Sequence, residues 1–168
     1  VGVANVLNRA FSNTYLGSDG IRLISASHVT VNGTQSNTLA ADADISEASL
    51  EDMLINIQNA TDSTGLRIGL QGVKLMVPPS RKYEATRILK SSGQNDTANN
   101  AVNAMKTMGD LGTIIVWPFL TDTDAWFIKT DAAEGLKLFN RRALAFEKDG
   151  DFDTGNYKHK ATERYSAG

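Results

Sequence analysis

The sequence contains no cysteine and only two histidines, His28 and His159. The absence of cysteine excludes disulfides, thiolate metal sites and cysteine nucleophiles. The two histidines stand far apart and leave little for a histidine-based metal site. No stretch approaches the roughly 18 apolar residues that a membrane span needs. We therefore expect a soluble protein with no cofactor and no membrane partner.

The chain also has no large excess of positive or negative side chains. The chain has 168 residues, with 17 Lys and Arg against 19 Asp and Glu, so the formal net charge is −2. Domains that neutralise phosphates are usually strongly basic, so this balance argues against nucleic-acid binding as the main task. The first residue is not Met, and Val3, Leu7 and Phe11 recur at helical spacing. We expect the sequence to be the C-terminal part of a larger chain.

Hydrophobic periodicity predicts both helices and strands. Helical spacing indicates helices over 1–12, 46–60 and 80–89, and weakly over 101–108. Asp44 and Glu47 are spaced as a capping box for the second helix. Apolar or β-branched runs indicate strands over 73–77, 113–117, 125–129, 136–139, 143–147 and 157–165. Residues 28–41 are interpreted as a loop or irregular ribbon, and residues 91–100 as an exposed polar loop. This mixture predicts an α+β fold.

The last predicted strand alternates two kinds of side chain. Its polar set is Lys158, Lys160, Thr162 and Arg164, and the other set is Tyr157, His159, Ala161 and Tyr165. Such alternation places the polar set on one face, as on an edge or interface strand.

Two acidic groups are candidate sites. Asp149, Asp151 and Asp153 are spaced like the first ligands of a calcium loop. However, Thr154 replaces the required glycine, and Lys160 replaces the closing glutamate. A solvated acidic turn is the better interpretation.

Asp122 and Asp124 could form a carboxylate pair for acid–base work or for a metal, because alternate residues of an extended segment point to one side. No histidine, lysine or further carboxylate lies nearby in sequence to complete such a site. An Asx turn, in which aspartate accepts from its own backbone, explains the pair more simply. A metal-dependent hydrolase using Asp122 and Asp124 stays open as the alternative from a different class.

The remaining candidates are basic or glycine-rich. Gly65, Gly69 and Gly72 match neither phosphate-binding pattern. The basic group, which we define as Arg141, Arg142, Lys158, Lys160 and Arg164, could contact nucleic acid or a carboxylate-rich partner. Its acidic neighbours are Glu134, Glu147, Asp149, Asp151, Asp153 and Glu163. Because they nearly cancel the positive charge, a polar protein interface is favoured over a DNA-binding surface. We therefore predict no catalytic, cofactor-binding or metal-ligating residue.

Several blocks of sequence resemble one known family. TDTDAWF, LKLFNRR, DFDTGN and KATERYS, in this order and spacing, resemble the C-terminal part of tailed-bacteriophage major capsid proteins with the Hong Kong 97-type fold. Upstream, FSNTYLGSDGIRLISASH resembles the segment that leaves the family's spine helix, and LMVPPSRKYEATRILKS resembles its strand, proline and helix unit. The family's N-terminal arm, extended loop and most of its spine helix are absent. The family also often continues beyond RYS.

This resemblance implies a non-enzymatic subunit that self-assembles into hexamers and pentamers of an icosahedral shell around double-stranded DNA, without sequence-specific binding. It implies an axial lobe over 39–130 and peripheral-lobe segments over 1–38 and 131–168, with residues 91–108 near the capsomer axis. Scaffolding, decoration and portal proteins would be further partners. The shell would assemble in the host cytoplasm and become part of the virion. An encapsulin-like bacterial compartment is the alternative within the same fold.

Overall fold

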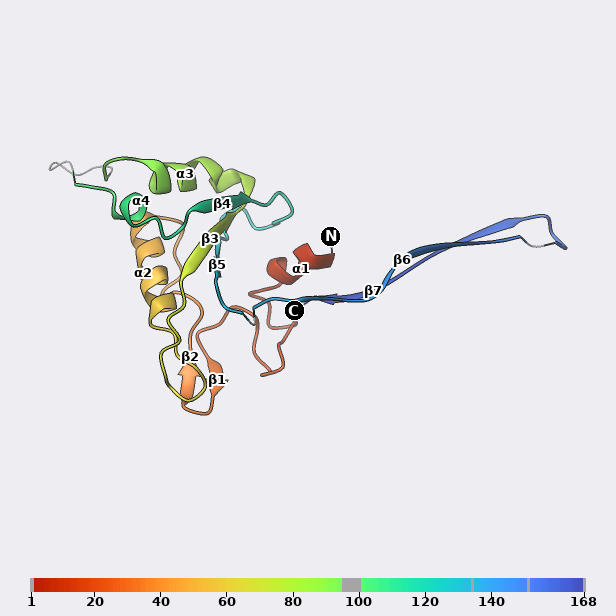
Figure 1. Ribbon diagram of the computed structural model, residues 1–168, viewed down its shortest axis with the longest axis horizontal. Helices are drawn as coiled ribbons and strands as arrows, with labels where there is room; N and C mark the ends of the chain where they lie inside the picture. The colour runs from red at the N-terminus through yellow and green to blue at the C-terminus, as the bar shows by residue number, and fades with distance from the viewer. Residues whose placement is uncertain (1, 95–100, 134, 151, 168) are drawn as a thin grey trace. The chain divides into compact units, whose positions relative to one another are not determined.

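A computed structural model of the chain describes residues 2–94, 101–133, 135–150 and 152–167. It contains helices and strands in mixed order, which agrees with the predicted α+β class. The chain divides into two compact units, residues 3–135 and residues 136–168 (Figure 1). The predicted axial and peripheral lobes concern positions within a shell, so their boundaries stay predictions.

The first unit is organised by a three-stranded sheet in the order β4-β3-β5. The central strand β3 (Gly72–Val77) pairs in parallel with β4 (Thr113–Val116) and antiparallel with β5 (Phe127–Thr130). A parallel pair needs a long crossover connection. Here the crossover carries η1 (Pro79–Arg81), α3 (Lys82–Lys90) and α4 (Ala104–Met108).

One hydrophobic core joins this sheet to its helices. Its buried residues are Ile45, Leu50, Leu54, Leu75, Val77, Ala85, Leu89, Met105 and Leu111. They come from β3, from α2 (Glu47–Gln58), from α3 and α4, and from two connections. Both strong helix predictions are confirmed, because apolar residues at steps of three and four do face this core. The weak helical spacing over 101–108 corresponds to the short helix α4.

The start of α2 differs from the prediction. Ser46 is the N-cap, and its hydroxyl accepts from the Ser49 backbone N–H at 3.1 Å while the Ser49 hydroxyl accepts from the Ser46 N–H at 2.9 Å. The capping box predicted from Asp44 and Glu47 is therefore wrong. Two serine hydroxyls at the same spacing make the reciprocal bonds, so the N-cap lies two residues later than Asp44 and the helix begins at Glu47.

The N-terminal segment contacts the part of the first unit that follows β4 in the sequence. Helix α1 (Gly2–Asn8) is shorter than the predicted 1–12, because turns follow it. The Asn8 side chain donates to the Phe119 carbonyl at 3.0 Å and accepts from the Thr121 N–H at 3.1 Å. The Phe11 and Phe127 rings stack at 5.8 Å. Residues 28–41 hold a short two-stranded ribbon of β1 (His28–Thr30) and β2 (Gly33–Gln35).

The crossover between α3 and α4 is fixed by one buried amide. Asn103 is 2% exposed, and its side chain donates to the Ile88 carbonyl and to the Ser91 hydroxyl while its oxygen caps α4 at Lys106 N–H. Gln94 N–H donates to the Ala101 carbonyl at 2.9 Å. The predicted polar loop over 91–100 falls mostly on residues 95–100, which lie outside the described residues.

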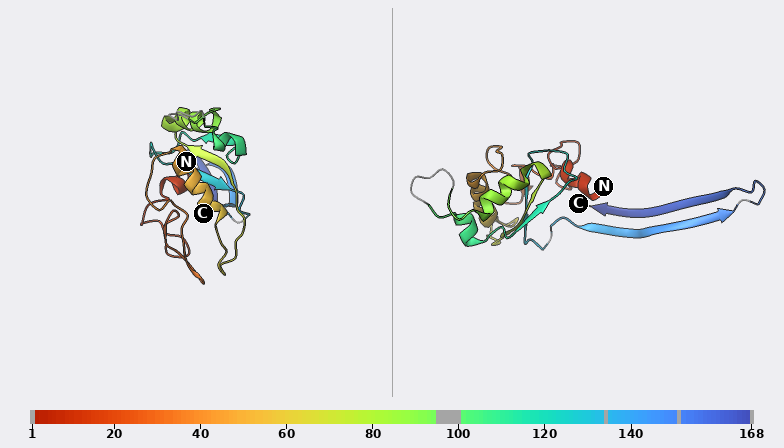
Figure 2. Two further views of the ribbon diagram at one scale, coloured as in Figure 1. Left: turned by 90° about the vertical axis from the view of Figure 1, so that its left-hand side faces the viewer. Right: turned by 90° about the horizontal axis from the view of Figure 1, so that it is seen from above.

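The second unit is a two-stranded antiparallel ribbon of β6 (Leu138–Gly150) and β7 (Tyr157–Ala167) (Figure 2). The strands predicted over 136–139 and 143–147 are one continuous strand, because β6 accommodates the polar residues between them with two register shifts. Within the described parts of the chain, no helix has both the length and the apolar character to cross a membrane.

Candidate assembly surface

The ribbon of β6 and β7 has almost no interior. Ala145, Thr162 and Ala167 are half-buried, and every other described residue of its two strands is exposed. Large apolar residues are among them. Their exposed fractions run from 46% to 78%: Leu138, Phe139, Leu144, Phe146, Tyr157 and Tyr165. Phe152, in the turn between the strands, is 100% exposed. An isolated two-stranded ribbon is marginally stable in water, and contiguous exposed apolar side chains mark interaction sites.

The register of the ribbon gives it two different faces. Residues directly opposite each other share a face, and alternate residues of β7 do so as well. One face, here called the aromatic face, holds Leu138, Phe146, Tyr157, Ala161 and Tyr165, together with Lys148 opposite His159. The other, the charged face, holds Arg142, Glu147, Asp149, Lys158, Lys160 and Arg164. The polar face predicted from the alternation of β7 is therefore confirmed.

On the charged face, residues of the predicted basic group lie opposite or close to acidic residues. Lys160 lies opposite Glu147, with Nζ to Oε2 at 3.6 Å, and Arg142 reaches Glu147 Oε1 at 3.7 Å. These side chains are more than half exposed, so each pair contributes at most about 1 kcal/mol. Opposite charges across a ladder favour one register over its alternatives. The charges therefore help to set the register that places Phe146, Tyr157 and Tyr165 on the other face, whereas Phe139, opposite Ser166, lies on the charged face.

The remaining basic residues lie beside the two register shifts. Arg142 stands opposite Arg164, and one shift occurs on each side of Arg142. The first shift leaves Arg141 as the extra residue in β6. Two of the predicted acidic neighbours, Glu134 and Asp151, lie outside the described residues. Asp149 lies on β6 opposite Lys158, one residue before the strand ends, and Asp153 lies in the turn that follows, so of these two only Asp153 fits the predicted acidic turn.

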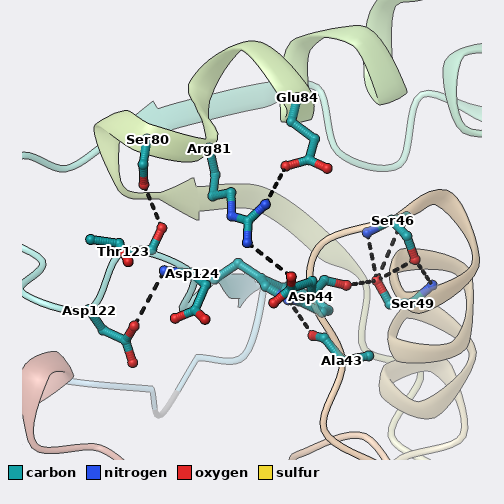
Figure 3. Close-up of polar contacts among 11 residues, drawn as sticks. Ala43, Asp44, Ser46, Ser49, Ser80, Arg81, Glu84, Asp122, Thr123 and Asp124 are labelled. Carbon is teal, nitrogen blue, oxygen red and sulfur yellow. Dashed lines mark hydrogen bonds and ion pairs between the residues drawn. The ribbon is translucent and has the colours of Figure 1, made fainter.

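The candidate pair of Asp122 and Asp124 forms a local turn (Figure 3). The Asp124 N–H donates to Asp122 Oδ1 at 3.3 Å, which supports the Asx interpretation. A hydrogen bond between the two carboxyl groups lowers the pKa of Asp122 and raises the pKa of Asp124. The negative charge of Asp44 acts on Asp124 in the same direction. The fold thus brings in a third carboxylate that sequence proximity could not reveal.

Asp44 is already engaged with an arginine. Arg81 Nη2 lies 3.0 Å from Asp44 Oδ2, and Arg81 Nη1 lies 2.9 Å from Glu84 Oε2 (Figure 3). Trp126 Nε1 donates to the Ala43 carbonyl at 3.2 Å, so the segment before α2 is held against β5. The carboxylates line an open groove of about 490 Å³ with Phe11, Arg22 and Trp126. Among the residues that the structure describes, no three potential ligands are placed to hold a metal ion.

The other sequence candidates serve the fold. Gly65 and Gly69 adopt positive φ angles in a loop, and Gly72 begins β3. A Cβ on Gly72 would lie 2.6 Å from a methyl group of Leu54, so this glycine permits α2 to approach the sheet. His28 Nδ1 lies 2.6 Å from Asp19 Oδ2 in an exposed pair, and His159 lies on the ribbon opposite Lys148. These residues do not converge on one site.

The chain thus combines a folded unit that has its own core with a ribbon that has almost none. A sequence model of the family described as "Phage capsid protein" matches residues 2–168, and the chain belongs to this family. Members of such a family are structural rather than enzymatic, are part of the virion, and associate with copies of themselves in the capsid. No curated protein and no solved structure matches the chain.

Proposed function

We propose that this protein is the shell-forming subunit of an icosahedral phage capsid. It assembles into hexamers and pentamers that enclose double-stranded DNA, and its fold is of the Hong Kong 97 type. Residues 39–130 form the axial lobe, and residues 1–38 and 131–168 belong to the peripheral lobe. The shell forms in the host cytoplasm, where scaffolding, portal and decoration proteins are its further partners.

The observation that carries this proposal is the exposed ribbon. Phe146 and Tyr157 are 76% and 78% exposed on the aromatic face. Burying a large apolar side chain contributes about 1.5–3 kcal/mol, and nothing within the ribbon buries these two. Contact with neighbouring copies supplies that burial. The near-zero net charge suits a container whose genome must enter and leave, because a strongly basic lining would hold phosphates tightly.

Electron microscopy and mass measurement of the purified protein test the proposal. We expect capsomer rings and closed particles. A protein that remains strictly monomeric at high concentration contradicts it. Particles recovered from the host after nuclease treatment should contain protected double-stranded DNA. Particles filled with a cargo protein instead would assign the chain to an encapsulin-like compartment.

A further inference from the structure

Helix α2 presents an exposed apolar residue among acidic ones. Leu50, Leu54 and Ile57 face the core, while Ile55 is 56% exposed on the opposite side. Glu51 and Asp52 lie one turn before Ile55 and so share its face. We call Glu51, Asp52 and Ile55 the acidic patch. Residues 38–66 contain six acidic residues and no Lys or Arg, so no base within this segment offsets the patch.

Helix α3 presents the opposite arrangement. Ala85 and Leu89 face the core, while Tyr83 is 67% exposed. Arg87 and Lys90 follow Tyr83 by one and two turns on the same face, and both are exposed. Lys82 Nζ lies 5.4 Å from the centre of the Tyr83 ring. We call Lys82, Tyr83, Arg87 and Lys90 the basic patch.

The charges of both patches lack partners within the described part of the chain. Glu51, Asp52, Arg87 and Lys90 make no ion pair there, whereas Arg81 and Glu84 beside them do. Each patch thus has an apolar centre and a rim of one charge, the arrangement found at protein interfaces. The two rims are of opposite sign.

The spacing of the two patches matches in an antiparallel alignment. Glu51 precedes Ile55 by four residues, and Arg87 follows Tyr83 by four, so each charge lies about 6 Å along its helix from the apolar centre. When the helices run in opposite directions, Ile55 meets Tyr83 and the acids meet Arg87 and Lys90. A parallel alignment would pair only one of these sets.

We propose that the acidic patch on α2 of one copy packs antiparallel against the basic patch on α3 of the next copy around a capsomer ring. This inference rests on the proposed function. Two different surfaces that meet head to tail generate a closed ring when the rotation between copies closes, as hexamers and pentamers require. The Ile55–Tyr83 contact supplies the buried centre, and the charges select the partner surface and speed the encounter.

Charge reversal tests the contact in the whole protein. One variant carries Glu51→Lys with Asp52→Lys, and a second carries Arg87→Glu with Lys90→Glu. Like charges facing each other are costly, so we expect each variant alone to lower the yield of rings by about tenfold or more. A third variant that combines all four changes restores opposite charges at every contact, and ring formation should return. Arg67→Glu with Lys129→Glu, at exposed positions outside both patches, is the control and should assemble like the wild type.

Mixing the two singly reversed variants gives a further readout. One variant has two basic patches and the other two acidic patches, so favourable rings must alternate them. A ring of six can alternate completely, whereas a ring of five leaves one contact between like charges. The mixture should therefore form hexamers but few pentamers or closed shells. Circular dichroism of each variant establishes that its first unit is folded.

The outcomes separate this inference from the proposed function. If the wild type does not assemble, the proposed function fails. If the wild type assembles and both singly reversed variants assemble equally well, the contact between α2 and α3 is wrong. It is also wrong if folded variants fail and neither the combined variant nor the mixture recovers rings. Higher salt should slow wild-type ring formation, because the screening length falls to about 3 Å at 1 M.

Discussion

The sheet of the first unit and the ribbon of the second are built from similar strands that bury very different fractions of their surface. In β3, Leu75 and Val77 are 0% exposed, whereas β6 has thirteen residues and only Ala145 is even half-buried. Strand hydrogen bonds are present in both. What differs is whether helices cover the strands. Hydrophobic burial therefore holds the first unit together within one chain, and under the proposed function neighbouring copies make the same contribution to the second.

The largest expected difference in the free energy of unfolding is between substitutions of one leucine in each unit. Leu75→Ala leaves a cavity in the core and should lower the free energy of unfolding by about 2–5 kcal/mol. Leu138→Ala, on the ribbon at 60% exposure, should change it by less than about 0.5 kcal/mol. Urea denaturation of the disassembled protein measures both. Equal effects would show that the ribbon contributes to the same cooperative core.

A smaller difference in the free energy of unfolding is expected between substitutions of a buried and an exposed asparagine. Asn103→Ala removes two side-chain donors and the cap of α4 at a position that is 2% exposed. We expect a loss of about 1–3 kcal/mol, because the Ile88 carbonyl and neighbouring groups lose a partner away from water. Asn140→Ala on the exposed ribbon is the matched control. A change below about 0.5 kcal/mol for Asn103→Ala would contradict its role in fixing the crossover.

A third contrast concerns helix capping. Ser46→Ala removes the N-cap of α2 and should cost about 1 kcal/mol in the free energy of unfolding. Ser166→Ala, at an exposed position of β7, should cost almost nothing. The thermal midpoints of the two variants measure the difference. Coincident midpoints would show that the reciprocal serine bonds do not stabilise the helix start.

The smallest effect on unfolding should accompany a large effect on assembly. Phe146→Ser with Tyr157→Ser removes two exposed aromatic side chains, so the first unit should unfold within about 0.5 kcal/mol of the wild type. Particle formation should be lost, because the aromatic face no longer supplies burial between copies. Lys148→Ser with His159→Ser changes the same face but leaves its large apolar residues in place, and particles should still form. Normal assembly of the first variant contradicts the role assigned to this face.

Much of this architecture follows from local patterns in the sequence. The steps of three and four that predicted α2 and α3 reflect a core on one side of each helix, and β3 ends at Val77, as in the strand predicted over 73–77. The alternation of Lys158 and Lys160 with aromatic residues predicted the faces of β7 correctly. These features depend on residues that are close together in the sequence, so they can be predicted from a single sequence.

The features that the sequence did not predict depend on residues that are far apart in the sequence. The meeting of Asp44 with Arg81 joins positions 37 apart in sequence, and no local pattern encodes it. The continuity of β6 was hidden because polar residues from Asn140 to Arg142 interrupt its apolar pattern, where the ladder shifts register. The pairing of Glu147 with Lys160 required that register to be known. Single-sequence patterns identify the elements but not their mutual alignment.

The two register shifts of β6 have a mechanical consequence. Each inserts one extra residue opposite β7 and interrupts the run of backbone hydrogen bonds, so the ribbon consists of stiff pieces joined at two softer points. Bending at those points breaks fewer bonds than bending elsewhere. A surface tiled with identical copies must curve more sharply at some places than at others. Under the proposed function, a ribbon with two register shifts would let one sequence follow both curvatures while its outer segments keep their pairing.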